Sequence, residues 1–125
     1  DAERELRASL ALTPDYLPAL LNLGNLHEDR GRRDAARDCY ERILSRDPLH
    51  VDALARLAGV SSVKSPDAAL AVRLREALAR PDLPAFDRAT LALALGRLLD
   101  GCGAYDAAFE AYAAANVASA ASRPP

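Results

Sequence analysis

The sequence has 125 residues, of which 50% are hydrophobic and 27% charged, and this composition is typical of a folded domain. It contains 28 Ala and 21 Leu but only eight Val, Ile and Thr together, which argues strongly against a β-sheet protein, since strands favour β-branched side chains. A net charge of −2 and the lack of any apolar run near the ~20 residues of a membrane span argue against nucleic acid and membranes as partners.

In chain order, apolar residues at helical spacing, separated by Pro and Gly, predict about seven α-helices. The sequence starts at Asp1 without Met and already inside the first helical pattern, which favours a segment of a longer chain. Pro66 and Asp67 suit the first turn of the fifth helix. The expected helices span 2–12, 17–30, 34–46, 51–63, 67–79, 85–100 and 104–121.

The same residue types recur at fixed distances along the chain. Pro14 and Pro48 lie 34 residues apart, and several further pairs lie 72 apart. A period near 34 with Gly, Ala, Tyr and Pro in fixed order indicates helix-turn-helix repeats. The pairs at a separation of 72 are Gly24 and Gly96, Gly31 and Gly103, Ala36 and Ala108, and Tyr40 and Tyr112.

The segment from Leu17 to His50 resembles a tetratricopeptide repeat (TPR) over its full length. Its matching residues are Leu23-Gly24, Gly31, Ala36, Tyr40 and Pro48. We expect Gly24 and Ala36 to let two helices cross closely and Tyr40 to fill the space toward the next repeat. Gly31 permits the positive φ that ends the first helix, and Pro48 stops the second.

The resemblance implies an all-α fold, a right-handed α-solenoid of TPR hairpins. The whole chain, 1–125, is then one array. Residues 1–16 hold the second helix of a truncated repeat, 17–50 a TPR, 51–84 a degenerate TPR and 85–121 a TPR with an extended last helix. Because the first helix lacks its hairpin partner, we expect its Leu6 and Leu10 side to be partly uncovered.

Residues with catalytic potential are few, so we expect no enzyme activity, metal or cofactor in this segment. His27 stands where the TPR pattern has an aromatic residue, which favours packing, and His50 in a turn favours a solvated side chain. Cys39 is expected to be buried or half-buried, and Cys102, between two glycines, to be exposed. Two distant cysteines with no pairing pattern favour the reducing cytoplasm.

The TPR resemblance implies that the concave groove binds a peptide or partner protein through the first helix of each hairpin. Asn22 and Asn25 share a helix face and can bond a peptide backbone, while the arginines can pair with acidic groups. The alternative is that these polar residues only solubilise the inner face. The groove candidates are Leu21, Asn22, Asn25, Asp29, Arg56, Leu93 and Arg97. A carboxylate clamp is not expected, since Leu21, Thr90 and Ala94 stand where it needs Lys or Arg.

The stretch from Leu74 to Asn116 resembles the last TPR before the catalytic domain of bacterial TPR-sulfotransferase proteins. Its matching runs are Arg80-Pro81-Asp82-Leu83, Ala94-Leu95-Gly96-Arg97, Tyr105 to Phe109 and Ala115-Asn116. This resemblance implies a larger bacterial parent with a catalytic domain after residue 125. The function expected here is a non-catalytic protein-binding scaffold. The alternative is a structural spacer or dimerisation module that packs against the missing domain, or forms a homodimer through the first helix.

Overall fold

The computed structural model describes residues 1–124. Every regular element within these residues is an α-helix, which confirms the all-α class and the number of helices expected from the sequence. The chain divides into two compact units, Asp1–Val60 and a second that starts at Ser61.

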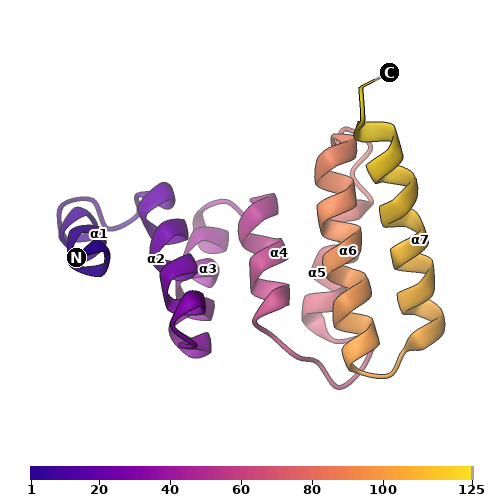
Figure 1. Ribbon diagram of the computed structural model, residues 1–125, viewed down its shortest axis with the longest axis horizontal. Helices are drawn as coiled ribbons and strands as arrows, with labels where there is room; N and C mark the ends of the chain where they lie inside the picture. Colours follow the sequence, from indigo (N-terminus) through magenta and orange to yellow (C-terminus); the bar gives the residue numbers. More distant parts are fainter. Residues whose placement is uncertain (125) are drawn as a thin grey trace. The chain divides into compact units, whose positions relative to one another are not determined.

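The first unit contains four helices, α1 (Ala2–Leu12), α2 (Leu17–Asp29), α3 (Arg33–Arg46) and α4 (Val51–Gly59). The helices α2 and α3 form an antiparallel hairpin (Figure 1), with α1 packed on α2 and α4 packed on α3. Asp1 caps α1, because its Oδ1 accepts a hydrogen bond from the Arg4 amide at 2.8 Å. The buried side chains of this unit include Leu20, Leu23, Ala36, Tyr40, Ile43, Leu54 and Leu57.

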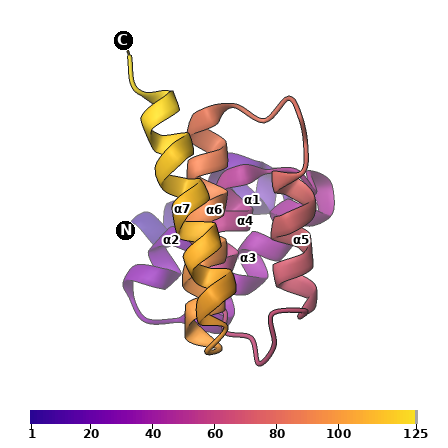
Figure 2. The ribbon, with the colours of Figure 1, turned by 90° about the vertical axis from the view of Figure 1, so that its right-hand side faces the viewer.

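The second unit contains α5 (Ala69–Leu78), α6 (Ala85–Gly101) and α7 (Tyr105–Ser122). The long helices α6 and α7 run side by side (Figure 1), so that α7 lies in front of α6 in Figure 2, and α5 packs on α6. Arg88 holds the connection between α5 and α6, since its guanidinium donates to the carbonyls of Leu78 and Arg80 at 2.6 and 2.9 Å. The buried face of α7 consists of Ala108, Ala111, Ala115 and Ala118.

The two hairpins, α2–α3 and α6–α7, are equivalent in sequence register. Gly31 and Gly103, which lie 72 residues apart, each follow the first helix with φ of 74° and 82°. Only glycine adopts such values without strain, so the expected helix-ending role of Gly31 is confirmed. The helix limits next to the turn agree with the repeat: α2 and α6 end at Asp29 and Gly101, and α3 and α7 begin at Arg33 and Tyr105, each pair again 72 apart.

The ends of two helices differ from the expectation. Helix α4 ends at Gly59 instead of residue 63, since glycine disfavours helix and two serines follow it. Helix α5 begins at Ala69, so Pro66 and Asp67 lie before it and the expectation for them was wrong. The Ala68 amide donates to the Ser65 carbonyl at 3.2 Å, which makes Pro66 the second residue of a turn.

The boundary between the two units, after Val60, lies inside the segment 51–84 that was expected to form one degenerate repeat. The repeat boundaries and the handedness of the solenoid therefore stay predictions. Among the helices of residues 1–124, none combines the length and the apolar character needed to cross a membrane.

Candidate partner-binding surface

The hairpin α2–α3 is organised around one close approach between Gly24 and Tyr40. A Cβ atom on Gly24 would lie 2.6 Å from Tyr40 Cε1, and one on Gly96 would lie 2.6 Å from the ring of Tyr112. The missing side chain therefore makes room for the tyrosine of the same hairpin. We expected Tyr40 to fill space toward the next repeat, and its contact with Gly24 was not predicted.

The Tyr40 hydroxyl fixes polar side chains at the surface of α2. It donates to Asn25 Oδ1 at 2.8 Å and to Glu28 Oε1 at 2.7 Å. A hydroxyl carries one hydrogen, so the two acceptors share it. Burial and the adjacent Glu28 carboxylate raise the pKa of Tyr40 far above its usual range, which keeps the hydroxyl protonated. Because Asn25 Oδ1 has this internal donor, its amide nitrogen is the group that can donate to a ligand.

Glu3 on α1 binds two arginines beyond the end of α2, Arg30 and Arg32, and also Arg7 of its own helix. Glu3 accepts from Arg7 at 3.0 Å, from Arg30 at 2.8 Å and from Arg32 at 2.9 Å. The hydrogen bonds from Arg32 and Arg7 lower the pKa of Glu3 to about 2. The pairs of Glu3 with Arg30 and Arg32 join residues 27 and 29 positions apart in the sequence. Helical periodicity does not predict contacts at such separations.

A hollow of about 360 Å³ lies between α1 and α2. Three of the predicted groove residues, Asn22, Asn25 and Asp29, line it together. Asn22 and Asp29 are exposed and Asn25 is half-buried. The other lining residues were not among the predicted groove residues, although Leu6 was expected on the partly uncovered side of the first helix. The hollow is completed by Ala2, Glu5, Leu6 and Leu26.

The remaining groove candidates lie elsewhere in the two units. Leu21 is half-buried on α2, and the Arg56 Nε on α4 donates to Asp52 Oδ1 at 3.1 Å. Leu93 and Arg97 are exposed on α6 in the second unit. A groove shared by all seven candidates therefore stays a prediction. The expectation for α1 is confirmed, because Leu6 and Leu10 are half-buried and no residue of this helix is buried.

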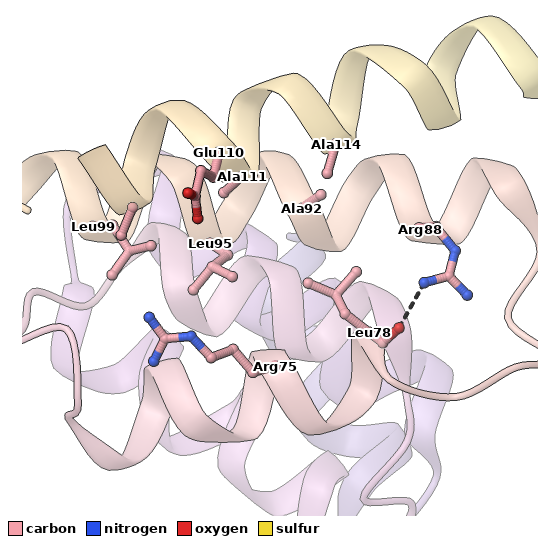
Figure 3. Close-up of a pocket in the computed structure, with 10 residues that line it drawn as sticks. Arg75, Leu78, Arg88, Ala92, Leu95, Leu99, Glu110, Ala111 and Ala114 are labelled. Carbon is pink, nitrogen blue, oxygen red and sulfur yellow. Dashed lines mark hydrogen bonds between the residues drawn. The ribbon is translucent and has the colours of Figure 1, made fainter. Parts of the chain in front are cut away.

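A second hollow, of about 280 Å³, lies between α5, α6 and α7 of the second unit (Figure 3). Its floor is apolar, and the charged side chains of Arg75 and Glu110 lie on opposite sides of Leu95. Arg75 also donates to the Pro66 carbonyl, so part of its guanidinium is already bonded within the unit. None of the predicted groove residues lines this hollow.

The histidines and cysteines have mainly structural surroundings. His27 is 4% exposed, which confirms the packing role, and burial lowers the pKa of its imidazole. The expectation for His50 was wrong, since its Nδ1 accepts from the Ala53 amide at 3.1 Å and caps α4. Cys39 is buried as expected and burial raises the pKa of its thiol. Cys102 is half-buried rather than exposed, and its thiol donates to the Leu99 carbonyl at 3.3 Å.

A search of residues 1–124 finds no group of three or more His, Cys, Asp or Glu side chains placed to hold a metal ion. The geometry that the described residues do present is a pair of helical hairpins with a hollow of mixed polar and apolar lining beside the first of them.

One comparison with known families bears on the first hairpin. Residues 17–60 match a family model described as Tetratricopeptide repeat. This part of the chain, which contains α2, α3 and α4, is therefore similar to a TPR. The matched hairpin α2–α3 has the same 72-residue register as α6–α7. Tetratricopeptide repeats generally mediate contacts between proteins and are generally non-catalytic. No curated protein matches the chain.

Proposed function

We propose that this segment is a non-catalytic scaffold that binds a peptide of a partner protein in the hollow between α1 and α2. The observation that carries the proposal is the convergence of Asn22, Asn25 and Asp29 on one hollow. Two amides and a carboxylate are groups that bond peptide N–H groups and basic side chains.

The charge of the hollow indicates which kind of peptide it would bind. Its only ionisable lining residues are the carboxylates of Glu5 and Asp29, while Leu6 and Leu26 supply apolar surface. Glu3 on α1 binds Arg7, Arg30 and Arg32, and the further arginine of this helix, Arg4, does not line the hollow. We therefore propose an extended peptide that places an Arg or Lys beside an apolar side chain.

The test is a library of immobilised short peptides, in which Arg or Lys flanked by Leu is compared with Asp or Glu in the same frame. We expect the basic peptides to bind and Asp29→Arg to weaken their binding by at least about tenfold, because it replaces one of the two carboxylates of the hollow by a positive charge. Asn22→Ala should weaken binding less. Asn25→Ala is avoided, since it also removes an acceptor from Tyr40.

The matched control is Asp38→Arg, which makes the same charge change at an exposed position of α3 outside the hollow. Equal affinity of the Asp29 and Asp38 variants, or binding of acidic peptides alone, would contradict the proposal.

A second function is favoured by the repeat itself. Leu6 stands 34 residues before Tyr40, and Tyr40 packs against the first helix of its own hairpin. Leu6 would then contact a preceding helix of a longer chain, and the hollow would be a packing site in a structural spacer or dimerisation module. A peptide that binds the 125-residue chain but not a longer parent chain would favour this function. A concentration-dependent dimer lost on Leu6→Glu would favour its dimeric form.

The parent protein belongs to the same proposal. The runs from Arg80 to Leu83 and from Ala94 to Arg97 support a bacterial, cytoplasmic TPR-sulfotransferase, in which this segment would orient an acceptor protein. Sequencing the parent gene beyond residue 125 tests it, and a following region without a phosphosulfate-binding loop would exclude it.

A further inference from the structure

We propose that the outer face of α7 forms an antiparallel contact with α7 of a second copy of this chain, with a two-fold axis at Ala113. This inference concerns the second unit and is independent of the hollow between α1 and α2.

An apolar row runs along the exposed face of α7. Its members, four residues apart, are Tyr105, Phe109, Ala113, Val117 and Ala121, and all five are exposed. Phe109 is 73% exposed and Val117 71%. Residues four apart form the ridge by which helices most commonly pack against one another. The row lies opposite the buried alanines of the same helix, so α6 does not cover it.

The equivalent row of the first hairpin is polar. The positions 72 residues earlier are Arg33, Arg37, Glu41 and Ser45 on α3, and Leu49 beyond the end of that helix. The helices α3 and α7 occupy equivalent positions in their hairpins, but this face is polar on α3 and apolar on α7. The repeat fold itself does not require an apolar residue there, which indicates that the row on α7 contacts something that α3 does not.

A following repeat is not the occupant that this face fits. In the first hairpin α4 packs on α3, whose buried residues include Ile43 and Leu44. The equivalent residues of α7 are Ala115 and Asn116, of which Asn116 is exposed and polar. Compared with α3, α7 is thus more polar on the face that would receive a following helix, and it is apolar in the outer row.

The row is complementary to itself in side-chain size. A two-fold axis at Ala113 places Phe109 of one copy opposite Val117 of the other, and Tyr105 opposite Ala121. Each large ring then meets a smaller side chain, and the small Ala113 at the crossing lets the helices approach. Such a contact is closed and isologous, so it gives a dimer and not a filament.

The charged residues near the row favour the antiparallel orientation of the two α7 helices. The exposed acidic residues Asp106 and Glu110 flank the first half of the row, and Arg123 caps the other end of the helix. An antiparallel pair puts Arg123 of one copy within a turn of the position opposite Asp106 of the other. A parallel pair would set the acidic residues against each other. The antiparallel helix dipoles also attract.

The first experiment is sedimentation velocity of the 125-residue chain over a roughly hundredfold range of concentration, which makes association visible by mass action. We expect a monomer–dimer equilibrium and at least about a tenfold lower association constant for Phe109→Glu. Phe86→Glu is the matched control, because Phe86 lies on α6 in the same unit and is 71% exposed. Both positions are exposed, so unchanged circular dichroism is expected for both variants.

The second experiment reads the register by disulfide formation in a Cys102→Ser background. Ala113→Cys should cross-link to its own copy under mild oxidation. Val117→Cys alone should not, because the two copies of residue 117 would lie about 12 Å apart along the axis, beyond the reach of a disulfide. A mixture of Phe109→Cys and Val117→Cys should again cross-link.

Three results would overturn the inference: a chain that stays monomeric at every concentration, a dimer that survives Phe109→Glu but is lost with Leu6→Glu, or failure of Ala113→Cys to cross-link. The first would assign the row to a different protein surface, and the second would assign dimerisation to α1.

Discussion

The contact between Gly24 and Tyr40 is the feature of this molecule least tolerant of change at the scale of a single residue. Tyr40 is fully buried and its hydroxyl is bonded to Asn25 and Glu28. The ring therefore cannot yield to a new atom, and its position holds the polar side chains beside the hollow. Tyr112, in the equivalent place, is half-buried and has only a 3.5 Å bond to Asp100.

We expect Gly24→Ala to lower the free energy of unfolding of the first unit by about 1–3 kcal/mol, since the new Cβ overlaps the Tyr40 ring. Urea unfolding followed by circular dichroism measures the change. Gly96→Ala should cost less, because Tyr112 is freer to move and alanine is the better helix former.

Gly59→Ala is the control for the glycine series, since nothing lies within 4 Å of the position of its added Cβ. It should leave stability unchanged or raise it. A Gly24→Ala variant as stable as Gly59→Ala would refute the role of the close approach.

Single residues were predicted from the sequence where the repeat pattern alone determines them. The positive φ of Gly31, the burial of Cys39 and the packing of His27 follow from their places in the pattern. His50 was misplaced because histidine is not among the common helix caps. Asn25 was predicted as a ligand group, and only the distance to the Tyr40 hydroxyl reveals its internal bond.

At the scale of a helix, α1 has no buried residue, and ion pairs help to hold it against α2. Its Glu3 links to Arg30 and Arg32 at the end of α2. The pKa of Glu3 is lowered from 4.5 to about 2. A lowered carboxyl pKa means that the ion pairs stabilise the packing of α1 at and above the ordinary pKa, and that this contribution is lost as the pH falls through the folded value.

We therefore expect α1 to loosen from α2 between about pH 4.5 and pH 2. Amide chemical shifts of α1 in an NMR titration report the change. Glu3→Gln should loosen α1 already at neutral pH and remove this step.

His27 titrates in the same unit and must be separated from Glu3. Its pKa is lowered by burial, so its contribution to stability is present above its ordinary pKa and is lost on acidification. The Glu3→Gln variant moves that step to lower pH, because the Glu3 carboxylate raises the pKa of His27, so the His27 ring resonances are followed beside the α1 amides to separate the two groups. A parent chain and variant with identical titrations would contradict the assignment.

The helices themselves were largely predictable, because Ala and Leu at helical spacing with Pro and Gly between them leave few alternatives. The segment between α4 and α5 was not predictable. The helical spacing of apolar residues continues beyond Gly59 and begins before Ala69, but α4 ends at Gly59 and the turn at Pro66 delays the start of α5. The hollow was foreseen only from the α2 side. Its α1 side depends on ion pairs between residues far apart in the sequence.

At the scale of the whole molecule, the chain consists of two compact units, each of which contains buried apolar side chains. Repeat proteins lose cooperativity where the coupling between neighbouring units is weak. We expect Tyr40→Ala to accelerate hydrogen exchange throughout α2 and α3 while leaving α6 and α7 protected. Mass spectrometry of peptides from both units measures this, and Leu91→Ala should give the converse pattern. Equal acceleration in both units by either variant would show a single cooperative unit instead.

The buried face of α7, made only of alanines, has a consequence for how the protein can vary. Every replacement there except glycine adds atoms between α6 and α7, so mutational drift at Ala108, Ala111, Ala115 and Ala118 can only widen the spacing of the two helices or weaken the helix. The outer row on the opposite side of the same helix is not restrained by α6. We therefore expect related chains to keep the inner alanines in every case, and to keep the outer row where they form the proposed contact with a second copy.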